Sequence, residues 1–105
     1  MQGPVIVLTT VGASFNAKQM ARDLVERRLC ACVNILPAVE SVYMWEGKLT
    51  EDAEQLLVIK TVAANLDELR DAVFSQHPYD VPEFVVISID DIRGPYRDWL
   101  LGAVS

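Results

Sequence analysis

Residues 30–62, CACVNILPAVESVYMWEGKLTEDAEQLLVIKTV, form the stretch of sequence that decides the fold. Apolar and polar residues alternate along its first half, which predicts a β-strand with two unequal faces. Near the midpoint lies Glu46-Gly47, and glycine readily adopts the positive φ that a tight hairpin turn requires. The stretch therefore predicts one long β-hairpin from Cys30 to Val62.

The first arm of this hairpin is long for a chain of 105 residues. Its residues, Cys30 to Trp45, would extend over roughly 50 Å as a straight strand, whereas a compact chain of this length has a radius of gyration of about 13 Å. We expect the arm to bend at Pro37 or to project beyond the core. A projecting tip would expose Tyr43, Met44 and Trp45 to water, which predicts an oligomer.

Length and charge favour a single domain, residues 1–105, that binds neither nucleic acid nor an anionic membrane. The net charge is −6, and a basic patch for phosphate groups is missing. The apolar opening segment is short and lacks a basic flank, so we interpret it as a strand and not as a signal peptide. Cys30 and Cys32 are poorly placed to bridge each other, which favours a reducing, cytoplasmic setting.

The rest of the chain predicts an α+β fold. The expected elements are a strand over Pro4–Val11, a helix from an N-cap at Ser14 to about Arg28, a helix with a capping box at Asn65–Glu68 that ends before Pro78, a strand over Glu83–Ile89 buried on both faces, and a short C-terminal helix over Tyr96–Ala103. With the hairpin, this order fits the ferredoxin-like βαββαβ antiparallel sheet. One sheet face stays open, and we expect identical subunits to cover it.

Four segments together resemble the CutA family of divalent-cation tolerance proteins. They are Leu29–Ile35, Ser41–Lys48, Ile59–Thr61 and His77–Glu83, and they cover the chain almost from end to end. The resemblance implies a homotrimer of ferredoxin-like subunits, similar in architecture to the PII signalling proteins. It also implies a role in tolerance of copper and other divalent metals.

The resemblance carries over to individual positions. The residues that match the family pattern are Cys32, Trp45, Glu54, Lys60, His77 and Tyr79. Two positions depart from it, since Thr9 stands where metal-binding members carry a cysteine and Gln76 where they carry a histidine. A copper site copied from such members would therefore lack two of its ligands here.

Cys32 and His77 are the candidate metal ligands, with Glu83 as a further oxygen donor. Thiolate and imidazole suit copper and zinc. The alternative is structural, because a strand cysteine is commonly a small buried hydrophobe and a histidine at a helix end commonly serves the helix dipole or a hydrogen bond.

A second candidate site is a ligand cleft between subunits. Its expected residues are Trp45, Glu54, Lys60, His77, Tyr79 and Glu83. Lys60 would bind a small anion, Trp45 would stack on it, and His77 would orient it together with Glu83. The alternatives are a structural ion pair for Glu54 and Lys60, which lie roughly 20 Å apart on one strand face, and subunit packing for Trp45.

The sequence offers little for catalysis. It has one histidine and neither a nucleophile elbow nor a glycine-rich phosphate loop. We therefore expect a non-enzymatic homotrimer for divalent-cation tolerance that binds copper, another divalent metal or a small ligand in clefts between subunits. The alternatives are a PII-like regulatory module that binds a small anionic metabolite and signals to a partner protein, and, third, a small hydrolase or isomerase that uses His77.

Overall fold

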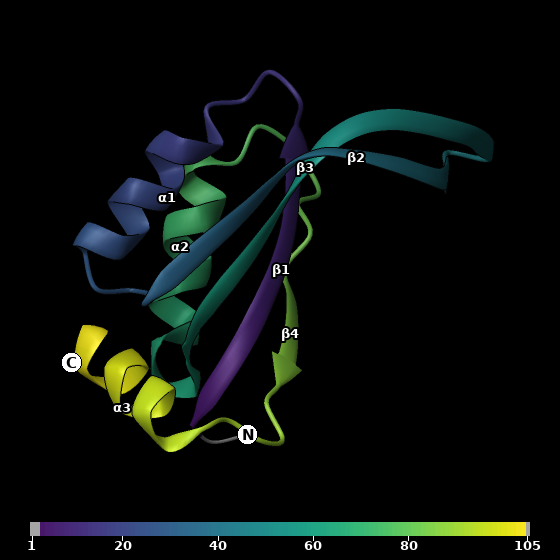
Figure 1. Ribbon diagram of the computed structural model, residues 1–105. Helices are drawn as coiled ribbons and strands as arrows, with labels where there is room; N and C mark the ends of the chain where they lie inside the picture. The colour runs from purple at the N-terminus through teal and green to yellow at the C-terminus, as the bar shows by residue number, and fades with distance from the viewer. Residues whose placement is uncertain (1–2, 105) are drawn as a thin grey trace.

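A computed structural model describes residues 3–104 and shows a four-stranded antiparallel sheet with three α-helices (Figure 1). In chain order the elements are β1 (Pro4–Gly12), α1 (Ala17–Glu26), β2 (Cys32–Trp45), β3 (Lys48–Val62), a 3₁₀ turn (Ala63–Asn65), α2 (Leu66–Gln76), β4 (Val85–Ser88) and α3 (Gly94–Ala103). The strands lie in the order β2-β3-β1-β4. This arrangement confirms the predicted ferredoxin-like βαββαβ fold with a short C-terminal helix.

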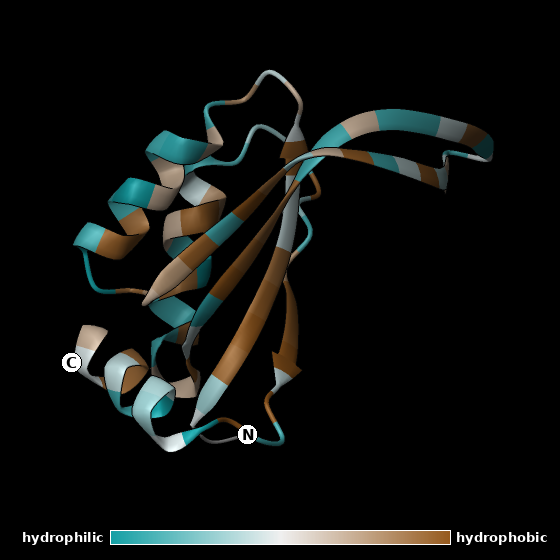
Figure 2. Ribbon diagram, in the orientation of Figure 1, coloured by the Kyte–Doolittle hydropathy of each residue, from teal (hydrophilic) through white to brown (hydrophobic). Residues whose placement is uncertain are grey.

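The hydrophobic core lies between the sheet and the two helices α1 and α2, which cover the same sheet face (Figure 1). Along β1 every second side chain is buried, because successive side chains of a strand point to opposite faces of the sheet and the helices cover only one face. Figure 2 shows the apolar bands of β1, β3 and β4 running through the body of the sheet. The opposite sheet face is largely uncovered, and α3 packs near one end of β1 and β3.

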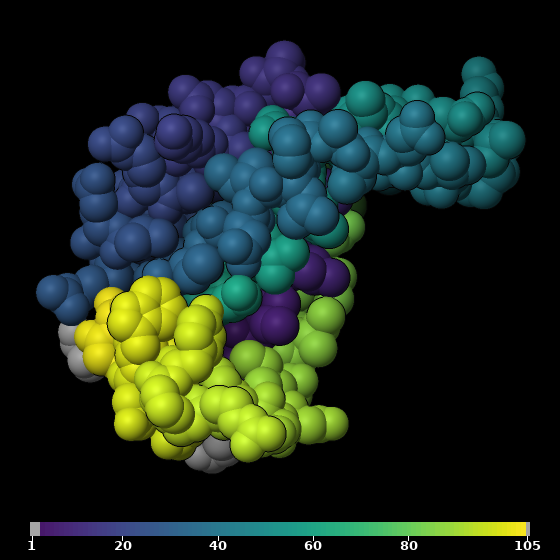
Figure 3. Space-filling view, in the orientation of Figure 1, coloured from purple at the N-terminus to yellow at the C-terminus, as the bar shows by residue number. Residues whose placement is uncertain are grey.

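The hairpin β2-β3 both bends and projects. Its pairing register shifts between Leu36 and Val39, on either side of Pro37, and a bulge of this kind bends the strand. Beyond the bend the hairpin stands clear of the body (Figure 3), which gives the chain extents of 44 × 27 × 23 Å. At the tip Glu46 and Gly47 have φ of 51° and 77°, the left-handed pair of a tight hairpin turn.

Three local predictions were wrong. The N-cap of α1 is Asn16 and not Ser14, since the Asn16 side chain accepts a hydrogen bond from the Gln19 backbone N–H at 3.1 Å. No capping box forms at Asn65, whose side-chain amide instead donates to the Arg28 carbonyl at 3.2 Å. Strand β4 is shorter than predicted and lies at the sheet edge, so Val85 and Ile87 remain exposed in the single chain.

Within residues 3–104, the helices are too short and too polar to cross a bilayer.

Candidate functional site

An open groove of about 810 Å³ lies where the hairpin leaves the body of the sheet. Residues of strands β1, β2 and β3 line it, together with residues of the loop between α2 and β4. The lining residues that carry polar or aromatic side chains are Thr10, Ser41, Tyr43, Trp45, Asp52, Glu54, Tyr79, Asp80 and Glu83. Four of these are carboxylates, and none is Lys or Arg. The groove is therefore acidic and aromatic.

Glu54 is the most deeply placed of these carboxylates. Its side chain lies on the face of β3 opposite to buried Leu57, and the residue is only 6% exposed. The Tyr79 hydroxyl donates a 2.7 Å hydrogen bond to its Oε2. Over residues 3–104 no Lys, Arg or His forms an ion pair with Glu54, so the structure holds a buried carboxylate without a cationic partner.

The charge of Glu54 acts on its neighbours. Burial and this charge together raise the pKa of Glu83, because a second carboxylate nearby disfavours ionisation. Burial, with the hydrogen bond to Glu54, also raises the pKa of the Tyr79 phenol. The groove therefore has an environment that favours positive charge in a ligand.

Asp52 lies two residues before Glu54 and faces the same side of β3. The Tyr43 hydroxyl donates a hydrogen bond to its Oδ2, and this bond is the main cause of the raised pKa of Tyr43. The Tyr43–Asp52 and Tyr79–Glu54 pairs thus repeat one arrangement, in which a phenol donates to a strand carboxylate at the groove wall.

His77 adjoins the groove, but both of its ring nitrogens are engaged. Nε2 lies 2.8 Å from the Thr10 carbonyl oxygen, and Nδ1 accepts a 3.1 Å hydrogen bond from the Tyr79 backbone N–H. This pairing assigns the neutral tautomer with the proton on Nε2. Burial lowers the pKa of His77, consistent with that form. Neither nitrogen has a lone pair left for a metal ion or for proton abstraction.

Cys32 lies far from His77. It pairs with Lys60, which pairs with Ile6, whereas His77 contacts Thr10. Four residues along β1 already separate the two sites by roughly 13 Å, so the two side chains of one chain cannot share a metal ion. The Cys32 thiol is half-buried and donates to Asn34 Oδ1 at 3.8 Å.

Cys30 is fully buried, and its environment keeps the thiol protonated. Burial and, second, the neighbouring Cys32 raise its pKa to about 12. Cys30 belongs to the hydrophobic core, where its thiol is held in the protonated form.

Lys60 lies outside the groove. Its Nζ lies 5.8 Å from the ring centroid of Tyr96 on α3, within cation–π range. The structure thus brings Trp45, Glu54, Tyr79 and Glu83 together in one groove. His77 does not line the groove but contacts Tyr79 and Thr10, which do, and Lys60 lies near the opposite end of β3.

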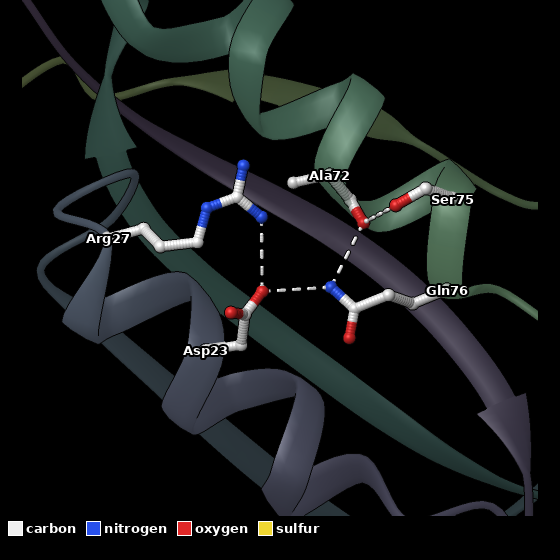
Figure 4. A network of polar contacts seen from close by, with 5 residues as sticks. All are labelled: Asp23, Arg27, Ala72, Ser75 and Gln76. Carbon is white, nitrogen blue, oxygen red and sulfur yellow. Dashed lines mark hydrogen bonds and ion pairs between the residues drawn. The ribbon is translucent and has the colours of Figure 1, made fainter.

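The two positions that depart from the family pattern, Thr9 and Gln76, are both part of the packing of the fold. Gln76 Nε2 donates to Asp23 Oδ2 at 3.0 Å and to the Ala72 carbonyl at 3.1 Å, while Arg27 donates to the same Asp23 oxygen (Figure 4). This network ties α2 to α1. Thr9 faces the core, fully buried, and its hydroxyl has no hydrogen-bond partner in the described part of the chain.

Sequence reasoning missed Asp52 and Asp80 as groove residues and assigned Tyr43 to subunit packing only. A signal for Asp52 was present, because it shares the strand face of Glu54 at a spacing of two residues. Asp80 lies in the loop between α2 and β4, and no periodicity predicts where a loop residue lies. Among residues 3–104, His, Cys, Asp and Glu side chains form no group of three that could hold a metal ion.

Comparison with known proteins gives one consistent family. Residues 5–103 match the family described as CutA1 divalent ion tolerance protein. The divalent-cation tolerance protein CutA of Thermus thermophilus is 44% identical over 95 residues, which are 90% of this chain and 92% of that protein. The chloroplastic protein CutA 1 of Oryza sativa is 44% identical over 91% of this chain, but the chain spans only 54% of its length.

Solved structures agree. The crystal structure of CutA1 from Oryza sativa has a TM-score of 0.92 at 41% identity, covering 99% of this chain and 96% of that one. The structure described as the periplasmic divalent cation tolerance protein CutA from Archaeoglobus fulgidus also has a TM-score of 0.92, at 30% identity, and covers 97% of this chain and 99% of that one.

Proposed function

Because the chain belongs to the CutA1 family of divalent ion tolerance proteins, we propose that it acts in divalent-cation tolerance, copper included, as a non-enzymatic homotrimer. In this proposal a metal ion or a small ligand binds in clefts between subunits, in the cytoplasm. The observation that supports it is the acidic groove around Glu54, which is open in the single chain and adjoins the projecting hairpin.

A second subunit would complete this groove. Carboxylate oxygens bind hard divalent cations, but Ca²⁺ takes six to eight oxygen ligands and Mg²⁺ near-ideal octahedral geometry. Within residues 3–104 no three Asp or Glu side chains gather closely enough to supply them. Further donors would come from a neighbouring subunit packed against the exposed apolar side chains of the hairpin, which include Val42, Met44 and Leu49.

Copper would use a softer donor. Cys32 is the accessible thiol of the chain, and thiolates favour Cu(I). Its remaining ligands would also come from outside its own chain, since His77 is distant and has both nitrogens engaged.

The regulatory alternative requires an anion beside Lys60, and the enzymatic alternative requires His77 as an acid or base. Lys60 lies outside the groove, over the Tyr96 ring, so it would not serve an anion bound there, and the carboxylates that line the groove would repel that anion. The hydrogen bonds of His77 leave it no free nitrogen. We therefore favour cation binding over both.

Calorimetric titration of the reduced protein with Cu(I), Cu(II), Mn²⁺ and Zn²⁺ tests the proposal. We expect saturable binding, with copper affinity lowered at least tenfold in Cys32→Ala and Mn²⁺ affinity lowered at least tenfold in Asp52→Asn. Cys30→Ala is the matched control, because its buried, protonated thiol is not expected to bind metal. Affinities equal to the native values in both test variants would contradict the proposed sites.

A further inference from the structure

The groove also has the size and the lining of a site for an elongated organic cation. Its volume of about 810 Å³ lies in the range of small-molecule sites, roughly 300–1,000 Å³. Its lining combines four carboxylates with the partly exposed rings of Tyr43, Trp45 and Tyr79. Aromatic faces and carboxylates together are the groups that recognise ammonium ions.

Glu54 indicates where one positive charge would bind. Only 6% of the residue is exposed. Among residues 3–104 the Tyr79 hydroxyl alone donates a hydrogen bond to the carboxylate, and Oε2 accepts it. Its Oε1 accepts no hydrogen bond from this part of the chain, and Glu54 lines the groove. Among residues 3–104 the buried side-chain oxygen without a partner is that of Thr9 and not Glu54 Oε1, so Oε1 keeps contact with solvent. Because Glu54 lines the groove, an ammonium group there could donate to this oxygen.

Asp52 indicates a second charge position. Residues two apart on one strand face lie about 7 Å apart, a separation comparable to that of the two ammonium groups of an extended four-carbon diamine. Tyr43 occupies only Oδ2 of Asp52. The intervening methylene groups would lie against the aromatic wall.

We propose that this groove binds an aliphatic diamine or polyamine, with one ammonium group at Glu54 and the next at Asp52. The inference rests on the proposed function in taking the groove as the ligand site, and it names a different ligand class for that site. No third carboxylate needs to approach the same point, in keeping with the dispersed arrangement of the acids.

Binding of 1,4-diaminobutane to the purified protein, measured by calorimetry and by thermal shift, tests the proposal. The controls are 1-aminobutane, which carries one charge, and MgCl₂ at equal ionic strength. We expect one diamine per chain and an affinity at least tenfold above that of the monoamine. In Glu54→Gln the diamine affinity should fall at least tenfold, whereas Asp98→Asn, an exposed change on α3, should leave it unchanged.

Absence of diamine binding, equal binding of the monoamine, or native affinity in Glu54→Gln would each overturn the proposal. If Glu54→Gln does not fold, Trp45→Leu replaces it, since Trp45 is half-exposed; an affinity loss of at least threefold is then expected, and native affinity is the overturning result. Metal binding without diamine binding would refute this inference alone, and diamine binding without metal binding would refute the metal site alone.

Discussion

At the scale of single residues, two buried threonines on one sheet face differ in a way that stability can measure. The Thr61 hydroxyl donates to the Leu29 carbonyl at 2.7 Å, whereas the Thr9 hydroxyl has no partner in the described residues. Both side chains are fully buried. Burying a hydroxyl without a hydrogen bond costs about 1–3 kcal/mol, so Thr9 lowers stability and Thr61 raises it.

We predict that Thr9→Val raises the free energy of unfolding by about 1 kcal/mol and the melting temperature by about 4–8 °C. The matched change Thr61→Val should lower the free energy of unfolding by about 1 kcal/mol, because it leaves the Leu29 carbonyl without this donor. Calorimetric unfolding of the three proteins decides the matter. Destabilisation by both valines would show that Thr9 has a partner in solution.

The candidate site could be predicted only in part from single residues. Matching to the family pattern identified Trp45, Glu54 and Tyr79, and the structure places all three in one groove. It also suggested Lys60 as a groove residue, although six residues of extended strand place Lys60 roughly 20 Å from Glu54. Sequence reasoning could not detect that His77 has both nitrogens engaged, since its partners are a backbone carbonyl and a backbone N–H.

At the scale of elements, the long hairpin was predictable because its signals are local. Alternation, Pro37 and Glu46-Gly47 each determine one feature of it: the strand, the bend and the turn. The start of helix α1 was not predictable in this way. Ser14 and Asn16 can both act as N-caps, and which of them does so depends on how the β1-α1 loop packs. Gln55 on β3 holds that loop through the Gly12 and Phe15 carbonyls, at 2.9 and 2.8 Å.

The loop between α2 and β4 is held to the sheet by neutral His77, which makes stability depend on pH. Its pKa is lowered in the folded state, so below the ordinary value of about 6.5 the unfolded chain binds the additional proton first. Stability should therefore be fully present above that value and fall as the pH drops through it toward the lower folded-state pKa. Protonation at Nδ1 would also remove the acceptor of the Tyr79 N–H.

We predict that His77→Asn reduces the loss of melting temperature between pH 7 and pH 5. Asparagine can still accept from the Tyr79 N–H but does not titrate in this range. Glu83, whose pKa is raised, acts in the opposite direction, because its ionisation destabilises the fold as the pH increases. Introducing Glu83→Gln into both the native protein and His77→Asn removes that contribution from the comparison. An unchanged pH dependence in His77→Asn would contradict the assignment to His77.

At the scale of the whole molecule, the apolar surface of the single chain is unevenly distributed. On the hairpin, Met44 and Leu49 form a cross-strand pair that is 63% and 69% exposed, and nothing within the described chain covers them. Val85 and Ile87 are exposed on edge strand β4. Exposed apolar side chains that lie together, such as Met44 and Leu49, are typical of an interface, and an open edge strand offers unpaired backbone groups to a neighbour.

We predict that the native protein has three times the 11.7 kDa chain mass in light scattering at micromolar concentration. Leu49→Glu should lower that mass, because the subunit contact would then have to bury a charge on the hairpin. Gln19→Glu adds the same charge on the exposed face of α1 and should leave the mass unchanged. A native monomer at this concentration would refute the trimer. It would also remove the neighbouring subunit from which the proposed metal site takes its remaining ligands, and would leave the diamine groove, built from one chain, as the binding site to pursue.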